Sequence, residues 1–139
     1  MKPWIYNNEI LNEVPAGAYG FVYLIENHNT GKLYVGKKFF WSVRRIKQKD
    51  KKNRKVVKKE SDWRTYYGSN AELKADLESH GYDNVDRTIL HLGAAKGELA
   101  YLETKEQFDR NVLLNESYYN SWISAKITKS HVKNLKVGG

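Results

Sequence analysis

The chain has 139 residues, which fits one domain with a real hydrophobic core, and it has no cysteine, which excludes disulfides and thiolate zinc sites. No apolar run reaches transmembrane length and the N-terminus lacks the apolar core of a signal peptide, so we expect a cytoplasmic protein without a membrane partner. The formal net charge of +8 favours a polyanionic partner.

The composition divides the chain into three expected parts. These are an N-terminal arm, residues 1–17, a domain, residues 18–127, and a basic C-terminal tail, residues 128–139. The domain is expected to contain a basic insertion, residues 44–60. The aromatic and aliphatic side chains of residues 4–6 would allow the arm to pack onto the domain.

Two β-rich apolar runs open the domain, residues 18–26 and residues 32–38. The segment between them, residues 27–31, contains Asn and Gly, which tolerate the positive φ angles of tight turns. The two runs are therefore predicted to pair as a hairpin. The near-continuous apolarity of residues 21–25 predicts that the first strand is buried on both faces.

A strongly basic stretch follows the hairpin. From Lys37 to Lys59 there are twelve Lys or Arg and a single acid, Asp50, so this stretch carries +11 and the rest of the chain carries −3. A run of basic residues usually forms a solvated loop without a specific partner. The charge density and the aromatic side chains on both flanks favour nucleic acid, because cations that neutralise phosphates release counterions. No apolar helical face accompanies the charges, which disfavours a membrane surface.

Two helices are predicted after the hairpin. The first begins near Phe39 and ends in a segment that is too polar to pack against the domain. It would carry three basic side chains on its exposed turns: Arg44, Arg45 and Lys47. The second begins at residues 69–72, which have the spacing of a capping box, and ends before Gly81.

The remaining elements are a strand over residues 85–92, a long helix over residues 97–114 and an edge strand over residues 122–127. The order of elements predicts an α+β domain with a small, mainly antiparallel three-stranded sheet flanked by helices.

Five short elements stand in an order that carries more information than any of them alone. Residues 20–23 (GFVY) are followed by residues 34–36 (YVG), so that Tyr34 comes eleven residues after Tyr23, and Arg44 follows Tyr34 by ten. Glu103 and the Tyr-Asn pair at residues 119–120 come later. Together they resemble the motifs of the GIY-YIG nuclease superfamily, from about residue 20 to residue 127.

The resemblance is strongest to the nuclease domains of Seg-type homing endonucleases of tailed phages, where a block similar to residues 62–69 (DWRTYYGS) also occurs. The first motif departs from Gly-Ile-Tyr and the second has Val for Ile, but both keep the tyrosine and its apolar neighbour. The resemblance implies the GIY-YIG nuclease fold with the basic stretch as a loop insertion, and a phosphodiester hydrolase that acts on DNA.

The resemblance also implies roles for site residues. Glu103 would bind one Mg²⁺, or Mn²⁺, as a hard oxygen ligand, although Glu98 and Glu106 lie nearby. Arg44 would offer a bidentate fork to the scissile phosphate. Asn120 would support the site by hydrogen bonding.

Catalysis by the two motif tyrosines requires one of them to accept a proton from the attacking water. A tyrosine with a pKa of about 10 is a poor base unless cations stabilise its phenolate, and Lys37, Lys38 and Arg44 could supply that field. The resemblance implies Tyr23 as the base and Tyr34 as its positioning partner, but the sequence leaves this assignment open. A covalent phosphotyrosine is an alternative.

DNA binding is assigned to the basic residues around the insertion: Lys38, Arg45, Lys47, Lys49, Lys51, Lys52, Arg54, Lys55, Lys58, Lys59 and Arg64. Because phosphate contacts do not read bases, we expect weak sequence preference, or dependence on a homodimer or a protein partner. Homing, degradation of host DNA and branched-DNA processing in a host cytoplasm fit equally well. A non-catalytic nucleic-acid-binding module that uses the same basic loop is the alternative to an enzyme.

Overall fold

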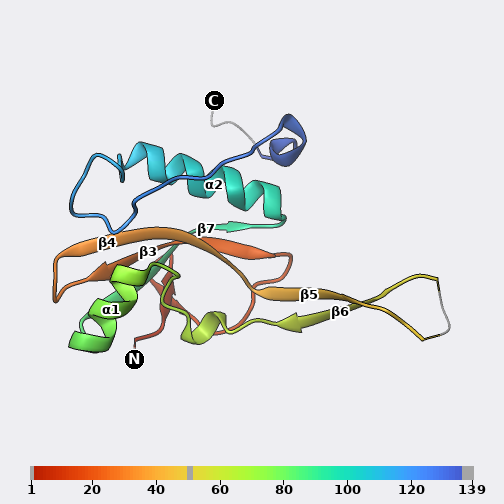
Figure 1. Ribbon diagram of the computed structural model, residues 1–139, viewed down its shortest axis with the longest axis horizontal. Helices are drawn as coiled ribbons and strands as arrows, with labels where there is room; N and C mark the ends of the chain where they lie inside the picture. Colours follow the sequence, from red (N-terminus) through yellow and green to blue (C-terminus); the bar gives the residue numbers. More distant parts are fainter. Residues whose placement is uncertain (1, 50–51, 136–139) are drawn as a thin grey trace.

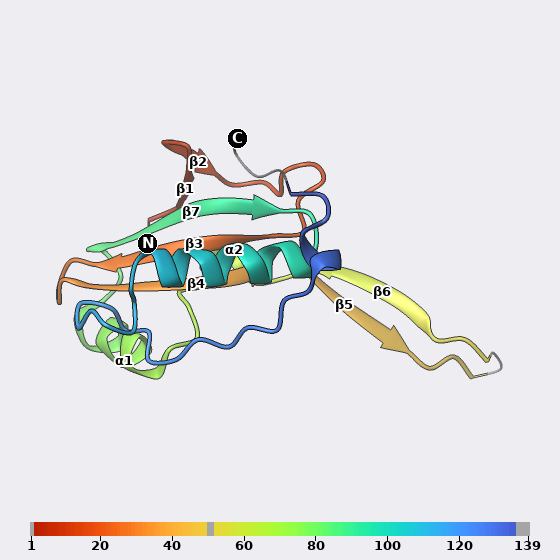
Figure 2. The same ribbon diagram turned by 90° about the horizontal axis from the view of Figure 1, so that it is seen from above.

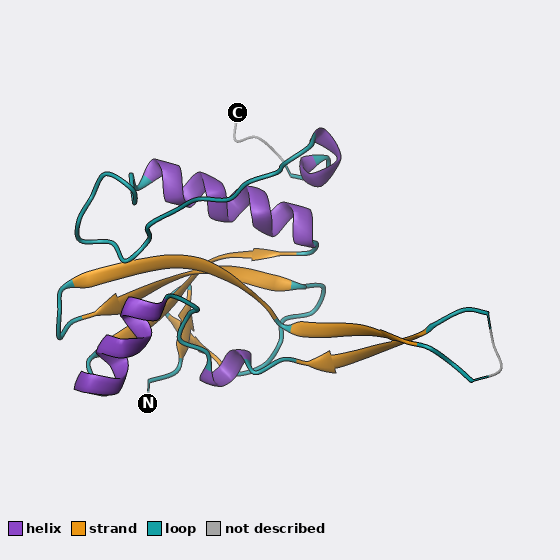
Figure 3. Ribbon diagram, viewed as in Figure 1, coloured by secondary structure: helices purple, strands orange, loops and turns teal. Residues whose placement is uncertain are grey.

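The computed structural model describes residues 2–49 and 52–135, which form an α+β domain and a projecting two-stranded ribbon (Figures 1 and 3). The main elements are β1 (Trp4–Tyr6), β2 (Glu9–Leu11), β3 (Gly20–Asn27), β4 (Lys32–Phe39), β5 (Trp41–Ile46), β6 (Lys55–Glu60), α1 (Ala71–His80), β7 (Val85–Gly93) and α2 (Lys96–Asp109). The α+β class predicted from the sequence is confirmed.

The sheet has five strands in the order β2-β1-β7-β3-β4, so the prediction of three strands is wrong. The N-terminal segment supplies the two additional strands, and β1 pairs with β7 in parallel while the other neighbours are antiparallel. Trp4 shows why the segment joins the sheet. Its indole is 1% exposed, and its Nε1 donates to the Trp63 carbonyl over 2.7 Å.

The predicted hairpin is confirmed as β3 and β4. Asn27 and Lys32 are its last paired residues, and Gly31 takes a φ of 74°, which is unstrained only for glycine. β3 lies between β7 and β4 and is buried on both faces, as its continuous apolarity predicts.

Two hydrophobic clusters lie on opposite faces of the sheet. α1 and α2 lie on these opposite sides (Figure 1). Phe21, Tyr23 and Ile25 of β3 face α1 and belong to one cluster. The alternate residues Val22 and Leu24 face α2 and belong to the other. A buried arginine on β7, Arg87, donates to three backbone carbonyls: those of Lys2, Arg64 and Tyr66.

The helix predicted from Phe39 is wrong, because residues 41–46 form β5, which pairs with β6 in a separate antiparallel ribbon (Figure 2). The β-branched residues of both segments suit a strand, and like charges three or four residues apart would repel on a helix. The partner strand follows only after a polar interval, so the local pattern around Arg44 does not reveal it.

The later elements need smaller corrections. α1 is capped by Asn70, one residue after the predicted capping-box serine, and ends at Gly81 as predicted. The last predicted helix is present as α2 but ends at Asp109, since Asn111 takes a φ of 52°. Residues 122–127 form no strand, so the predicted edge strand is wrong.

Candidate active site

A cleft of about 920 Å³ opens at the free edge of β4. It brings together five of the six residues predicted to be catalytic: Tyr23, Tyr34, Lys37, Glu103 and Asn120. β3, β4, α2 and the segment after α2 contribute these side chains. Because β4 is an edge strand, residues from both of its faces reach the cleft.

Three tyrosines cluster on the α1 side of the sheet, and two of them, Tyr23 and Tyr34, line the cleft. The ring of Tyr23 lies 6.1 Å from that of Tyr34 and 6.0 Å from that of Tyr66, measured between centroids. The Lys38 ammonium lies 4.1 Å from the centroid of the Tyr66 ring, so a cation borders the cluster.

Gly36 allows this arrangement. It lies directly opposite Tyr23 in the β3–β4 register. A Cβ at residue 36 would lie 2.4 Å from the Tyr23 hydroxyl oxygen and 3.0 Å from Cε2 of Tyr34. The glycine of the second motif is therefore required by the close approach of the two tyrosine rings.

The surroundings raise the pKa of both motif tyrosines. Burial raises the pKa of Tyr23 well above 10.0, and the neighbouring Tyr66, Tyr34 and Glu103 raise it further. Burial also raises the pKa of Tyr34, while a hydrogen bond from Ser69 lowers it. Both side chains are therefore neutral phenols at neutral pH in the DNA-free protein.

This shift predicts a loss of stability at alkaline pH. A phenol with a raised pKa in the folded state stabilises the fold below the unfolded pKa of about 10, and that contribution is lost as pH rises towards the folded pKa. We expect the free energy of unfolding to fall above pH 10, with Tyr23 contributing up to about 1.4 kcal/mol per pH unit. Urea unfolding from pH 8 to pH 11 measures the slope.

Tyr23→Phe should make that slope shallower. Tyr101→Phe, which removes a partly exposed phenol from α2, is the matched control. An unchanged slope in Tyr23→Phe would contradict the assignment of the alkaline transition to Tyr23.

Glu103 is the carboxylate that α2 presents to the cleft. Its Oε1 lies 3.0 Å from the Nζ of Lys37, and the side chain is 14% exposed. The two other glutamates considered from the sequence lie elsewhere. Glu98 accepts from the backbone nitrogen of Ala94, and Glu106 pairs with His91 and Arg110.

Asn120 holds the backbone of β4 between the second motif's tyrosine and glycine. Its Oδ1 accepts from the Val35 nitrogen over 3.0 Å, and its Nδ2 donates to the Val35 oxygen over 2.8 Å. Gln107 of α2 donates to the same oxygen over 3.2 Å. These side chains replace the missing neighbour strand at this point and fix the position of β4.

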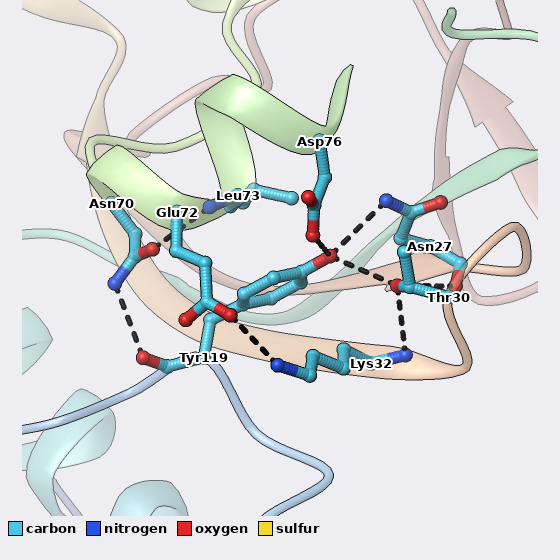
Figure 4. Close-up of polar contacts among 8 residues, drawn as sticks. All are labelled: Asn27, Thr30, Lys32, Asn70, Glu72, Leu73, Asp76 and Tyr119. Atoms are coloured by element: carbon cyan, nitrogen blue, oxygen red, sulfur yellow. Dashed lines mark hydrogen bonds and ion pairs between the residues drawn. The ribbon is translucent and has the colours of Figure 1, made fainter. Parts of the chain in front are cut away.

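The preceding residue, Tyr119, ties three parts of the chain together (Figure 4). Its hydroxyl group bonds Asn27 at 3.1 Å, Thr30 at 2.9 Å and Asp76 at 2.8 Å, so it joins the β3–β4 turn to α1. Asn70, the cap of α1, donates to the Tyr119 carbonyl. The Tyr-Asn pair thus positions both α1 and β4 beside the cleft.

Arg44 is not among the residues that line the cleft. It lies exposed on β5, opposite Val57. The cations that line the cleft are Lys37, Lys38 and Lys96. The structure therefore brings lysines, rather than Arg44, to the place where a scissile phosphate would be neutralised.

The residues assigned to DNA binding fall into three places. Lys38 lines the cleft, and Arg64 is engaged with the Asn12 carbonyl, Glu13 and Glu60. The others lie on the ribbon or beside its ends: Arg45, Lys47, Lys49, Lys52, Arg54, Lys55, Lys58 and Lys59. Lys51 lies outside the described residues.

Sequence reasoning missed three residues of the site. Tyr66 lies within the block of residues 62–69, but its contact with Tyr23 depends on the fold. Gln107 lies four residues after Glu103, a spacing that puts both on one face of a helix and could have identified it. Lys96, at the start of α2, had no local signal.

The described residues contain no group of three or more His, Cys, Asp or Glu side chains that could hold a metal ion. Glu103 is thus the carboxylate available in the cleft. A magnesium site needs no more, because Mg²⁺ keeps several waters and is bound by one or two carboxylates together with substrate phosphates. The donor set fits a metal ion held jointly with DNA.

No helix in the described part of the chain is long and apolar enough to cross a membrane. No curated protein and no solved structure matches the chain. The family model described as "Putative endonuclease segE, GIY-YIG domain" matches residues 4–123, which include every residue of the cleft discussed above. The chain therefore belongs to the SegE-type GIY-YIG endonuclease family and is a nuclease that hydrolyses phosphodiester bonds.

Proposed function

We propose that the protein is a divalent-metal-dependent DNA endonuclease whose chemistry takes place in the cleft at the edge of β4. The observation that carries the proposal is the meeting of two tyrosines, a lysine, a glutamate and an asparagine in one cleft. Residues as distant as Tyr23 and Asn120 contribute to it. A domain that only binds DNA has no need to hold two neutral phenols beside a carboxylate and its lysine.

Glu103 would hold the metal ion, Mg²⁺ or Mn²⁺, and nucleases of this family generally use divalent metal ions. The ion would neutralise charge on a phosphoryl oxygen and stabilise the leaving alkoxide. Lys37, which is paired with Glu103 in the DNA-free protein, would then be available to a phosphate oxygen. Lys38 and Lys96 would neutralise the remaining phosphate charge.

The tyrosine pair would orient the attacking water and accept its proton. Their raised pKa values mean that neither accepts a proton readily in the DNA-free protein. Because the negative charge of Glu103 contributes to both shifts, neutralising that charge favours the phenolate. Tyr23 is proposed as the base and Tyr34 as its partner, with the Tyr66 ring packed against the Tyr23 ring.

The exposed basic ribbon would bind DNA mainly through its backbone phosphates, with weak sequence preference as the result. Stronger selectivity would require a second copy of the chain or a protein partner. A homing-type or DNA-degrading role is part of the proposal and rests on the resemblance to Seg-type endonucleases of tailed phages. A cleavage map on DNA of phage-genome length tests the weak preference, which a single dominant site would refute.

Cleavage of supercoiled plasmid tests the proposed function. With Mg²⁺ or Mn²⁺ we expect conversion to nicked or linear forms, and with EDTA we expect none, since the leaving group would lack its stabilising ion. A gel-mobility assay on the same mixtures reports binding separately. If the plasmid stays intact with either metal while its mobility shifts, the protein is a DNA-binding module and the proposal fails.

A further inference from the structure

The β5–β6 ribbon carries most of the basic insertion away from the cleft (Figures 1 and 2). Six residue pairs run from Trp41–Glu60 at its base to Ile46–Lys55. At about 3.4 Å per residue this is an arm of roughly 17 Å. Both views show it projecting beyond the five-stranded sheet, so both of its faces could be reached by a large ligand.

The register divides the ribbon into two faces, because residues directly opposite in an antiparallel pair lie on the same side. We call them the Arg44 face and the Trp41 face. The Arg44 face consists of Ser42, Arg44, Ile46, Lys55, Val57 and Lys59. The Trp41 face consists of Trp41, Val43, Arg45, Val56, Lys58 and Glu60.

The two faces differ in their charge and in how many of their side chains already make contacts within the protein. The Arg44 face carries three cations and no acid, whereas the Trp41 face carries two cations and Glu60. On the Trp41 face, Lys58 lies 4.3 Å from the centroid of the Trp41 ring, and Glu60 accepts from Trp63 and pairs with Arg64. The Arg44 face is therefore the more positive of the two.

The position of the ribbon suits the same DNA that would enter the cleft. The base of the ribbon borders the cleft with both faces, since Ser42 of the Arg44 face and Trp41 and Val43 of the Trp41 face line it. Arg44 and Lys59 follow Ser42 outwards along the Arg44 face. Trp41 and Lys58 also border a second hollow, formed with residues 14–19, so the base of the Trp41 face is turned towards the body of the domain.

We propose that the β5–β6 ribbon enters the major groove of duplex DNA beside the cleavage site, with its Arg44 face towards the DNA. The major groove, about 12 Å wide, admits a two-stranded ribbon in undistorted B-DNA, whereas binding in the minor groove, about 6 Å wide, requires the duplex to be bent or widened. Arg44 then contacts base edges, and Lys55 and Lys59 contact the flanking phosphates. The proposal rests on the proposed function, because it takes the DNA to be the substrate held in the cleft.

The test compares two double variants that each remove two positive charges from the ribbon. Binding of a 30-bp duplex is measured in EDTA at fixed salt, where the gel also verifies that the DNA stays intact. We expect Arg44→Ala/Lys59→Ala to raise the Kd by about 30-fold or more and Arg45→Ala/Lys58→Ala by about 3-fold. Equal losses would mean that only total charge matters and would overturn the proposal.

Methylation interference identifies the groove. Methylation of guanine N7, in the major groove, should inhibit binding of the wild-type protein, and methylation of adenine N3, in the minor groove, should not. The reverse pattern would overturn the proposal. So would Arg44→Ala retaining wild-type binding while losing cleavage at saturating DNA, since Arg44 would then act at the scissile phosphate.

The experiments distinguish a failure of the ribbon proposal from a failure of the proposed nuclease function. Plasmid cleavage by the wild-type protein with equal losses in the two double variants would remove the ribbon proposal alone. Intact plasmid with the expected difference in Kd and interference at guanine N7 would remove the nuclease function and leave the ribbon as a groove-binding element.

Discussion

Replacing Glu103 by glutamine is expected to reduce plasmid cleavage by about 100-fold or more while DNA binding in EDTA is retained. Glutamine has nearly the shape of glutamate but no negative charge, so it loses the affinity for a divalent ion and the ion pair with Lys37. Initial rates of nicking with saturating Mg²⁺ measure the effect. Urea unfolding of the same variant verifies that the fold is intact.

Glu106→Gln is the matched control. Glu106 lies on the same helix, three residues later, but pairs with His91 and Arg110 and does not line the cleft. It should therefore cleave at close to the wild-type rate. Comparable losses in the two variants would indicate that charge on α2, rather than a ligand at residue 103, matters for cleavage.

The sequence predicted the parts of the site that depend on local chain geometry. Tyr23 and Tyr34 lie in two strands joined by a short turn, so pairing the strands brings both tyrosines to one face. The helical spacing of apolar residues over residues 97–114 predicts the helix that carries Glu103, whereas the choice of Glu103 and Asn120 as site residues follows from the resemblance to the family motifs.

The incorrect or missing predictions share a physical cause: the segment with which each element pairs or packs lies far away in the sequence. Residues 41–46 become a strand because residues 55–60 pair with them, and residues 4–6 become a strand because β7 offers a free edge. Neither partner is visible in a short window of sequence. The same holds for Tyr66, whose loop is held in place by Arg87 from β7.

The placement of Arg44 illustrates how an error in one element spreads to a site. An arginine ten residues after Tyr34 fits the family pattern on a helix, but on β5 it projects from the exposed ribbon. Its catalytic role stays a prediction that nothing in the DNA-free structure supports. The cations that line the cleft are the lysines at residues 37, 38 and 96.

Replacing Gly36 by alanine is expected to reduce cleavage by about 100-fold and to destabilise the fold by about 1–3 kcal/mol. The added Cβ would lie 2.4 Å from the Tyr23 hydroxyl oxygen, 2.7 Å from Tyr23 Cζ and 3.0 Å from Tyr34 Cε2. Tyr23 is 1% exposed, and the rings of Trp4, Phe21 and Tyr66 pack against its ring, so the ring has little room to withdraw. Nicking rates and urea unfolding at pH 7.5 measure the two effects.

Tyr23→Phe in the same chain separates steric strain from lost chemistry. Removing the hydroxyl group removes the closest of the three contacts, so the destabilisation caused by Gly36→Ala should be smaller in the Tyr23→Phe background than in the wild type. Cleavage should not recover, because the phenol that accepts the proton is gone. Additive stabilities would show that residue 36 does not press on the Tyr23 hydroxyl group, and recovered cleavage would show that this hydroxyl group takes no part in the reaction.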